Sequence, residues 1–548
     1  LILKEGDWVV LNPVNTNASQ LEHGRLAVIE KLEIEACRVA LGWRGASKNR
    51  FQPWHRQDDP QPNQDYIIDP MTDDINANKA CLAIEQAQSN TLHTWLTVDR
   101  PDQQLMFHPS ETDTFLGWID QVEGDKRLTN RQIEVVTNNQ KLLLVQGPPG
   151  TGKSYTLAWA LLHRLYQAWQ QGCSCAVAVA CFTHSASRVV LNQLADRCRA
   201  LSKLIPDFPS IPIYKIGDSD QNQELTDQVQ TFDPYQIDGG NTLPNLLAAN
   251  RVIIFGGTSA GFYNLARSAT TGKQPNWKKK YFDLLAIDEA SQMSLPYALL
   301  SAAWLKPEGE MVVVGDPRQM PPIHKHNWQK ELRPTAIYQQ PYHSLFEALQ
   351  ERGLAPIGLD RSFRLHRTVA QFLAQRIYLK DGINFYSERT EVIPAIKTDD
   401  AYLQAVMNPD YPLVVVEHQE QESEQYNPME IQLLTPIIEA CLDQLNLNDA
   451  NGIGVVVPHR AQRAELRRQF PQLYTAIDTV ERFQGGQREV IIVSATASDP
   501  DYVQQESEFI LNLNRLNVAL SRAEKKLIVI ASTSLGQLLT NDIEMLPN

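Results

Sequence analysis

The chain has 548 residues, of which 43% are hydrophobic and 21% are charged. These fractions are close to those of soluble globular proteins, and they exclude a disordered, collagen-like or low-complexity chain. The formal net charge of −14 argues against a passive nucleic-acid binder with a broadly basic surface. Contacts to a phosphate backbone depend on a local groove, however, so the net charge does not exclude an enzyme that acts on nucleic acid.

No apolar run approaches the roughly 18 to 20 residues needed to cross a bilayer, and residues 1–7 lack the apolar core of a signal peptide. We therefore expect a cytoplasmic protein with no membrane partner. The seven cysteines include no CxxC pair, so the sequence predicts neither a disulfide framework nor a zinc or iron–sulfur site. Because the chain begins with Leu1 and not with Met, we expect it to be part of a longer polypeptide with upstream modules.

The first part of the chain has the pattern of short strands separated by Asn, Pro and Gly clusters. This pattern is typical of a small β-barrel, which we place at residues 1–55. Residues 56–125 are expected to form a linker or a helical stalk. The individual elements expected here are strands at residues 7–11, 25–30 and 36–43, a loop at 57–65 and a helix at 77–88.

Two stretches are basic and contain no acid. The first runs from Arg38 to Arg56 and includes Trp43, Phe51 and Trp54, a mixture suited to phosphates and stacked bases. A solvated face with core aromatics explains the same residues equally well. The second stretch runs through residues 267–280.

From residue 141 onward, short apolar strands alternate with amphipathic helices, which is the pattern of a doubly wound parallel sheet. A second run of the same kind follows, so we predict two consecutive α/β domains. The first is placed at residues 126–335, with a small inserted subdomain at about 206–250, and the second at residues 336–548. The expected strands are 141–146, 176–181, 252–255, 284–287 and 311–314 in the first domain, and 413–416, 453–457, 490–494 and 527–531 in the second.

A phosphate-binding loop follows the first of these strands. Residues 147–154 fit the pattern GxxxxGK[ST] and precede a helix expected to start near Tyr155. Backbone N–H groups and the helix N-terminus then face the anion, Lys153 reaches the β and γ phosphates, and Ser154 offers a Mg²⁺ ligand. The predicted nucleotide-binding residues of the loop are Gly147, Pro148, Pro149, Gly150, Thr151, Gly152, Lys153 and Ser154.

Acidic and polar residues follow two later strands. Asp288 suits a Mg²⁺-bound water, and Glu289 suits the general base that orients the attacking water. Without the phosphate loop, this pair would be interpreted as a solvated turn. Gln319, which follows the strand at 311–314, is expected near the γ-phosphate, although the prolines beside it are also compatible with a simple turn.

The second α/β domain has no phosphate loop, but it contains Arg364 and Arg522. Facing a nucleotide bound by the first domain, they would stabilise transition-state charge when the cleft closes. Either arginine is also compatible with a surface salt bridge.

The ordered set of motifs resembles superfamily 1 helicases over residues 128–532. DEAS and GDPRQMPP are similar to the 1B branch, which includes the nonsense-mediated-decay helicase and the Okazaki-fragment nuclease-helicase. The resemblance implies a P-loop NTPase with two RecA-like domains behind an accessory barrel, with ATP and Mg²⁺ as cofactors. The motifs are LTNRQ (128–132), GPPGTGKS (147–154), THSA (183–186), GT (257–258), DEAS (288–291), GDPRQMPP (315–322), SFRLH (362–366), VVVPHRAQ (455–462), TVERFQG (479–485) and LNVALSRA (516–523).

The resemblance also assigns roles to individual residues. It implies that Gln132 reads the adenine edge, that Phe363 stacks on the adenine where many relatives have Tyr, and that Gly485 belongs to the nucleotide site. Two residues depart from the family pattern, since Gln487 stands where an acid is usual and His184 where Asn is common. The residues implied to lie along the single-strand groove are Thr183, Thr258, His459 and Thr479.

The function implied is that of an ATP-dependent helicase and translocase, expected to be a monomer that moves 5′ to 3′ on single-stranded nucleic acid. DNA is favoured over RNA, and a fused upstream nuclease is left open. An ABC-type ATPase is rejected, because the signature-like segment at 484–488 follows Glu289 and leads into a strand. An RNA helicase, a nucleoprotein remodeller with little unwinding, and a binding module with an inactive ATPase remain as alternatives.

Overall fold

The computed structural model divides the chain into two compact units, residues 1–82 and 83–548. We describe each unit by itself. The structure describes residues 8–13, 25–33, 38–43, 66–70, 75–101, 112–217, 225–235, 242–270, 274–322, 343–483 and 486–536.

The first unit contains a four-stranded antiparallel sheet with the order β3–β2–β1–β4. Val9 pairs with Ala27, and the buried side chains of Val9, Ala27 and Ile29 form its core. The three expected strands are confirmed. A fourth strand lies beyond residue 55 and pairs with the edge of the first strand that the second strand leaves open. The strands are β1 (Trp8–Pro13), β2 (Arg25–Glu33), β3 (Arg38–Trp43) and β4 (Tyr66–Pro70).

Short helices connect this sheet to the α/β domains. The helix expected at 77–88 is confirmed as α1 (Ile75–Glu85) and the 3₁₀ turn η3 (Ala87–Ser89). Asn90 caps the next helix, α2 (Thr91–Thr97), and its amide donates to the backbone oxygen of Leu299 at 2.7 Å. This hydrogen bond holds the N-terminus of α2 against another part of the second unit.

The first α/β domain contains an eight-stranded parallel sheet with the order β12–β5–β11–β10–β6–β9–β7–β8. All five strands expected in this domain are confirmed, and their near-continuous apolar sequences are buried on both faces. The strands are β5 (Leu142–Gln146), β6 (Cys175–Cys181), β7 (Ile213–Ile216), β8 (Val229–Phe232), β9 (Val252–Thr258), β10 (Phe282–Asp288), β11 (Leu305–Gly315) and β12 (Ile357–Gly358).

The inserted subdomain expected at about 206–250 stays a prediction, and the structure describes part of this stretch. Two of its segments form β7 and β8, which extend the main sheet beside β9. Aromatic packing explains this position, because Tyr214 stacks on Phe255 at 5.3 Å and Phe232 meets the same ring edge-on at 6.0 Å. The apolar strand β9 thus recruits segments that look polar in the sequence.

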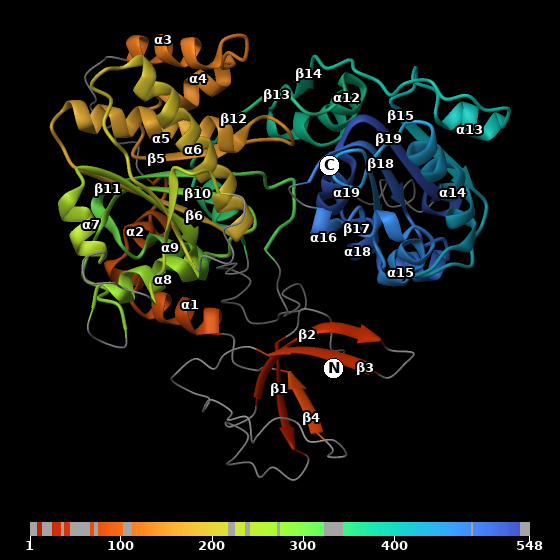
Figure 1. The fold of residues 1–548 in the computed structure, drawn as a ribbon, viewed down its shortest axis with the longest axis horizontal. Helices are drawn as coiled ribbons and strands as arrows, with labels where there is room; N and C mark the ends of the chain where they lie inside the picture. Colours follow the sequence, from red (N-terminus) through yellow and green to blue (C-terminus); the bar gives the residue numbers. More distant parts are fainter. Residues whose placement is uncertain are drawn as a thin grey trace. The chain divides into compact units, whose positions relative to one another are not determined.

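Helices cover both faces of this sheet. In Figure 1, α5 and α6 lie on one face and α8 and α9 on the other, as expected when right-handed connections run in opposite directions from one strand. Twelve consecutive residues of α5, from Thr156 to Gln167, are buried. The helices are α3 (Thr112–Glu123), α4 (Asn130–Thr137), α5 (Lys153–Gln170), α6 (His184–Leu204), α7 (Leu243–Ala249), α8 (Ser259–Ser268) and α9 (Leu295–Ala302).

The second α/β domain contains a five-stranded parallel sheet with the order β15–β19–β18–β16–β17. The four expected strands are confirmed, and two consecutive RecA-like domains are therefore present. Its sheet strands are β15 (Leu413–His418), β16 (Ile453–Val457), β17 (Ile477–Thr479), β18 (Arg488–Ser494) and β19 (Ala523–Ser532).

Smaller elements complete this domain. A two-stranded parallel pair, β13 (Arg361–Ser362) and β14 (Tyr386–Ser387), precedes the sheet. The helices are α11 (Leu345–Glu351), α12 (Arg367–Arg376), η6 (Tyr378–Asp381), α13 (Ala401–Val406), α14 (Pro428–Asp443), α15 (Arg460–Gln469), η7 (Pro471–Leu473), α16 (Val480–Phe483), α17 (Pro500–Gln505), α18 (Ser507–Ile510) and α19 (Leu513–Leu520).

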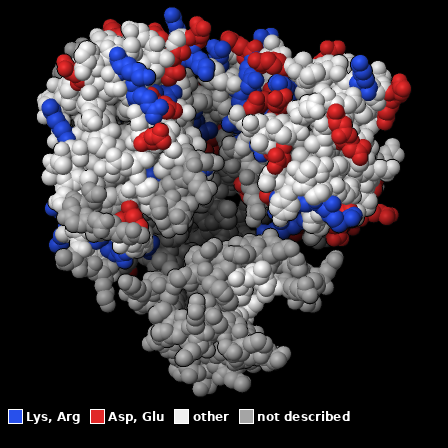
Figure 2. Space-filling model, in the orientation of Figure 1, with Lys and Arg blue, Asp and Glu red and all other residues white. Residues whose placement is uncertain are grey.

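The described helices are all too short or too polar to cross a bilayer. On the face drawn in Figure 2, acidic and basic side chains are intermixed over both α/β domains. This mixture agrees with the net charge of −14 and leaves any contact with nucleic acid to local groups.

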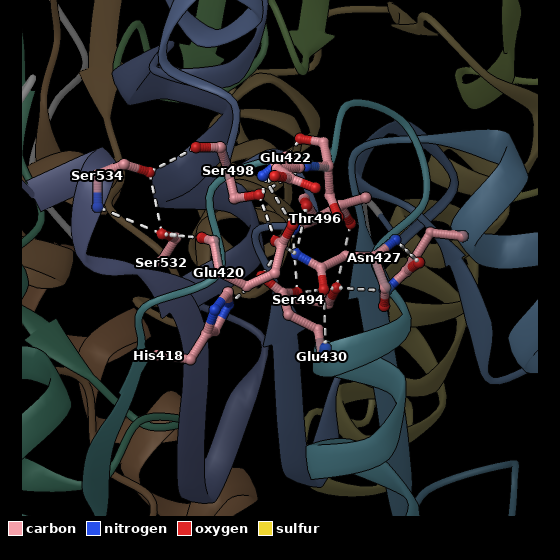
Figure 3. Close-up of polar contacts among 12 residues, drawn as sticks. His418, Glu420, Glu422, Asn427, Glu430, Ser494, Thr496, Ser498, Ser532 and Ser534 are labelled. Atoms are coloured by element: carbon pink, nitrogen blue, oxygen red, sulfur yellow. Dashed lines mark hydrogen bonds and ion pairs between the residues drawn. The ribbon is translucent and has the colours of Figure 1, made fainter.

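A buried polar network joins the carboxyl ends of β15, β18 and β19 (Figure 3). Glu430, which is fully buried on α14, accepts hydrogen bonds from the backbone N–H of Thr496 at 3.0 and 3.1 Å and from the Ser494 hydroxyl. Thr496 has a φ of +66°, a left-handed conformation that a β-branched residue rarely adopts. Asn427 caps α14 and donates to the Thr496 oxygen at 3.0 Å. The carboxylate of Glu430 therefore holds a strained backbone turn in place.

We predict that Glu430→Ala lowers the free energy of unfolding by about 2 to 4 kcal/mol, because buried donors lose a charged acceptor. The measurement is thermal or denaturant unfolding followed by circular dichroism. Glu439→Ala, on the exposed face of the same helix, is the control and should leave the unfolding midpoint nearly unchanged. Equal stability of the two variants would contradict the role of Glu430.

Candidate active site

The phosphate loop lies between β5 and α5, at the carboxyl edge of the first sheet. Gly150 has a φ of +75°, and a Cβ on it would lie 2.6 Å from both the Cβ of Arg364 and the Oγ of Ser362. Glycine is therefore required twice at this position, by the backbone conformation and by the close approach of the second domain. The hydroxyl of Ser362 donates to the Pro149 oxygen at 3.0 Å, so the second domain contacts the loop directly.

The remaining loop residues shape its interior. The Thr151 hydroxyl donates to the Pro148 oxygen at 2.8 Å, and Gly152, with a φ of +77°, precedes the first residue of α5. The ammonium group of Lys153 donates to the Gly147 oxygen at 2.8 Å. The lysine thus folds across the loop, within reach of the space that the phosphates of a nucleotide would take.

Ser154 and Asp288 meet beside this loop. The Ser154 hydroxyl donates to Oδ2 of Asp288 at 2.8 Å. Burial and the charge of Glu289 raise the pKa of Asp288 to about 6, while Ser154 and Lys153 act in the opposite direction. A hydroxyl and a carboxylate oxygen so close together fit Mg²⁺, which commonly takes one or two protein oxygens and completes its shell with water and phosphate.

Glu289 adopts a strained backbone conformation next to Asp288. Its φ is +56°, which is uncommon for a residue other than glycine, and its Oε2 accepts a hydrogen bond from Gln292 at 3.1 Å. Such strain is frequent at functional sites, where it aims a side chain. Here it directs the carboxylate toward the cavity that Asp288 also lines.

That cavity has a volume of about 660 Å³ and is lined by both α/β domains. The first domain contributes the phosphate loop with Asp288 and Glu289, and the second contributes Arg364. Its size is within the usual range for small-molecule sites. The structure therefore brings the predicted phosphate, metal and base residues together in one space.

The two predicted arginine fingers lie next to each other, where the second α/β domain faces the first. Arg364 donates to Oε1 of Gln487 at 2.8 Å, and Arg522 donates to Oε1 of Gln319 at 3.4 Å. Burial lowers the pKa of Arg364, and burial followed by repulsion from Arg364 lowers the pKa of Arg522 to about 9. A pKa of about 9 leaves the guanidinium group of Arg522 charged at neutral pH.

Gln487 is one of the two residues that depart from the family pattern, and its contact with Arg364 shows what this change does. As an amide, it accepts the hydrogen bond of Arg364 without neutralising the positive charge. The predicted site residue Gly485 lies outside the described residues.

The two predicted adenine contacts differ in their surroundings. Gln132 is buried, and both ends of its amide are engaged, since it accepts from Thr129 N at 3.0 Å and donates to the Thr151 oxygen at 3.1 Å. Phe363 is 42% exposed, and its N–H donates to the Gly150 oxygen at 2.8 Å. The guanidinium group of Arg361 lies over the Phe363 ring at 5.1 Å, and stacking of this ring on a base stays a prediction. Gln132 links its helix to the phosphate loop.

Three of the predicted nucleic-acid residues lie at strand ends. Thr183 follows β6, and Thr258 is the last residue of the neighbouring strand β9, where it pairs with Cys181. Each threonine caps a helix through its hydroxyl. Thr479 ends β17 in the second domain. Helix N-termini of this kind attract phosphate groups.

His459 has a different environment. It is 8% exposed, and its ring packs against Tyr502 and Phe509 at 5.8 and 5.7 Å. Burial and the nearby charge of Arg515 lower its pKa to about 4, so the imidazole is neutral at physiological pH. A contact between His459 and nucleic acid stays a prediction.

Sequence reasoning missed a group of residues around the loop after β11. Arg318 forms an ion pair with Asp381, and the Tyr378 hydroxyl donates to Asp316. Asn517 lies within the motif LNVALSRA, so the sequence contained a signal that could have identified it. Tyr378 and Asp381 belong to none of the motifs. Only their positions in space reveal them.

Comparison with known proteins gives two family matches. Residues 131–325 and residues 342–534 each match a family described as an AAA domain. The first match includes the phosphate loop and the described residues of the loop after β11, and the second match includes both arginines.

Three relatives are helicases by name. The DNA replication ATP-dependent helicase/nuclease DNA2 of Mus musculus is 25% identical over 442 residues, which cover 75% of this chain and 37% of that protein. The putative helicase MOV-10 of Gallus gallus is 25% identical over 76% of this chain and 45% of its own length, and helicase sen1 of Schizosaccharomyces pombe is 29% identical over 46% and 14%. The chain thus spans less than half the length of each of these relatives. With two regions that match an AAA domain and helicases among its relatives, the chain is similar to superfamily 1 helicases, and these findings support an ATP-dependent helicase enzyme.

Proposed function

We propose that this chain is an ATP-driven translocase and helicase that moves 5′ to 3′ along single-stranded nucleic acid, with DNA as the favoured track. The observation that supports this most is the single cavity lined by Lys153, Asp288 and Glu289 from the first α/β domain and by Arg364 from the second. A nucleotide held between two domains couples hydrolysis to their opening and closing.

In the proposed reaction, Lys153 binds the β and γ phosphates of ATP, and Glu289 orients the attacking water and accepts its proton. Arg364 and Arg522 stabilise the charge that develops on the transferred phosphoryl group. Ser154 and Asp288 would hold Mg²⁺, which neutralises phosphate charge when bound. Gln319, in the loop after β11 of the first domain, accepts a hydrogen bond from Arg522 at 3.4 Å and would lie close to the γ-phosphate.

The proposed track crosses the ends of the strands that carry Thr183, Thr258 and Thr479. DNA is favoured because several of the relatives are named for DNA replication. The direction follows from the resemblance of DEAS and GDPRQMPP to the 1B branch.

We predict that Glu289→Gln lowers kcat for ATP hydrolysis by about 10²-fold or more while nucleotide affinity is kept, because the shape of the base remains and its charge is lost. Turnover is measured by phosphate release, and affinity by titration with a fluorescent nucleotide. Glu308→Gln, at an exposed position on β11, is the matched control. Lost affinity with retained turnover would make Glu289 a structural residue.

We predict that Arg522→Ala lowers kcat on the order of 10³-fold with little change in KM for ATP, because a finger acts mainly on transition-state charge. Arg376→Ala, on the exposed surface of α12, controls for loss of a surface arginine. Thermal unfolding of both variants separates catalysis from folding. A raised KM with unchanged kcat would assign Arg522 to ground-state binding.

We predict that a partial duplex with a 5′ single-stranded DNA tail is unwound in preference to the same duplex with a 3′ tail. Strand separation is followed with ATP and Mg²⁺ present, beside matched RNA substrates. Preference for the 3′ tail would overturn the direction, and stronger stimulation by RNA would favour an RNA helicase. ATP turnover stimulated by the strand, without unwinding of either duplex, would support a nucleoprotein remodeller.

A further inference from the structure

The loop after β11 leaves the first α/β domain and is held by the second. The amides of Asn514 and Asn517 donate to the backbone oxygens of Pro317 and Arg318 at 3.1 and 2.7 Å. Met320 joins the apolar core of the second domain. A segment that begins as the end of a first-domain strand is therefore packed as part of the second domain.

Asp316 is the polar centre of this loop. It is fully buried, and its Oδ2 accepts hydrogen bonds from Nε2 of Gln319 at 2.8 Å and from the hydroxyl of Tyr378 at 2.8 Å. Its Oδ1 accepts from the backbone N–H of Arg318 at 3.2 Å. Because the amide nitrogen of Gln319 donates to the Asp316 carboxylate, the amide oxygen of Gln319 faces Arg522.

Tyr378 reaches this centre from the second domain. It belongs to η6, is 0% exposed, and packs against the ring of Phe385 at 5.1 Å within the core that also contains Leu373. Its hydroxyl donates to Asp316 and accepts a hydrogen bond from Asn517 at 2.7 Å. The ring is anchored by packing, so the position of the hydroxyl is set by the second domain.

An ion pair on the same turn strengthens this connection. Arg318 binds Asp381, the last residue of η6, and Gln146 at the end of β5 donates to the same carboxylate at 2.8 Å. The turn η6 therefore contacts two strand ends of the first domain. Tyr378 and Asp381 hold the loop from its buried side and its more exposed side.

We infer that Tyr378 is a positioning residue for ATP hydrolysis: its hydroxyl fixes Asp316, and through Asp316 it sets Gln319 against Arg522 at the nucleotide cavity. This inference rests on the proposed ATPase function. The path runs from the core of the second domain to the first-domain loop and back to an arginine of the second domain. A shift of η6 relative to β11 then changes the geometry of Gln319 and Arg522 together, without any contact between Tyr378 and the nucleotide.

Tyr378→Phe tests this with a minimal change, since it removes the hydroxyl and keeps the packing of the ring. We expect kcat for nucleic-acid-stimulated ATP hydrolysis to fall by about tenfold or more, with KM for ATP changed less than about twofold. The matched control is Tyr402→Phe in the same domain, where the lost hydroxyl donates to the Leu433 oxygen at 3.0 Å. Equal kcat in the two variants would overturn the inference.

A second measurement does not depend on turnover. Hydrogen exchange at the backbone amides of Arg318 and Gln319, which are bonded to Asp316, should be about tenfold faster in Tyr378→Phe than in Tyr402→Phe. Lower kcat without faster exchange would overturn the route through Asp316, and faster exchange with unchanged kcat would overturn the role in hydrolysis. A wild-type chain without ATP turnover would overturn the proposed function, and the exchange measurement would then still decide whether Tyr378 fixes the loop.

Discussion

Parallel pairing of β5, β11 and β10 is the constraint on which the rest of the site depends. Val313 pairs with both Leu144 and Ile287, so these strands end at the same level. Because parallel strands direct their carboxyl ends to one edge, the phosphate loop, Asp288 and the loop after β11 emerge side by side. Neither the proposed metal ligands nor Gln319 would meet the phosphate loop if one of these strands shifted its register.

Buried charge is the main electrostatic cost of this arrangement. Asp288, Asp316 and Arg522 are each almost completely withdrawn from water. Burial raises the pKa values of the two carboxyl groups and lowers that of the guanidinium group, because it favours the neutral form of each. Hydrogen bonds from Ser154, Gln319 and Tyr378 to the two carboxylates offset part of this penalty. In the proposed reaction, a polyanionic nucleotide and a cation would each pair with charges that are already in place.

The second domain has two polar networks with different tasks. The network of Glu430 and Thr496 joins strand ends within one sheet and makes that edge rigid. The contacts of Tyr378, Asp381 and Asn517 instead reach across to the first domain. A rigid edge on one side and a polar connection on the other allow the second domain to respond to the nucleotide as a unit.

The sequence by itself determined the alternating α/β pattern and the phosphate loop. Nine strands were predictable because each is a short apolar run between turn residues, and GxxxxGKS was predictable because its chemistry is local. Tertiary structure alone decided the place of β7 and β8, since short mixed segments become strands only by pairing beside β9 and packing on Phe255. It also decided the burial of His459 and the bond between Tyr378 and Asp316, which are 62 residues apart. No local pattern encodes a hydrogen bond between residues that approach each other only when two domains pack together, because their separation in the chain leaves no periodic signal.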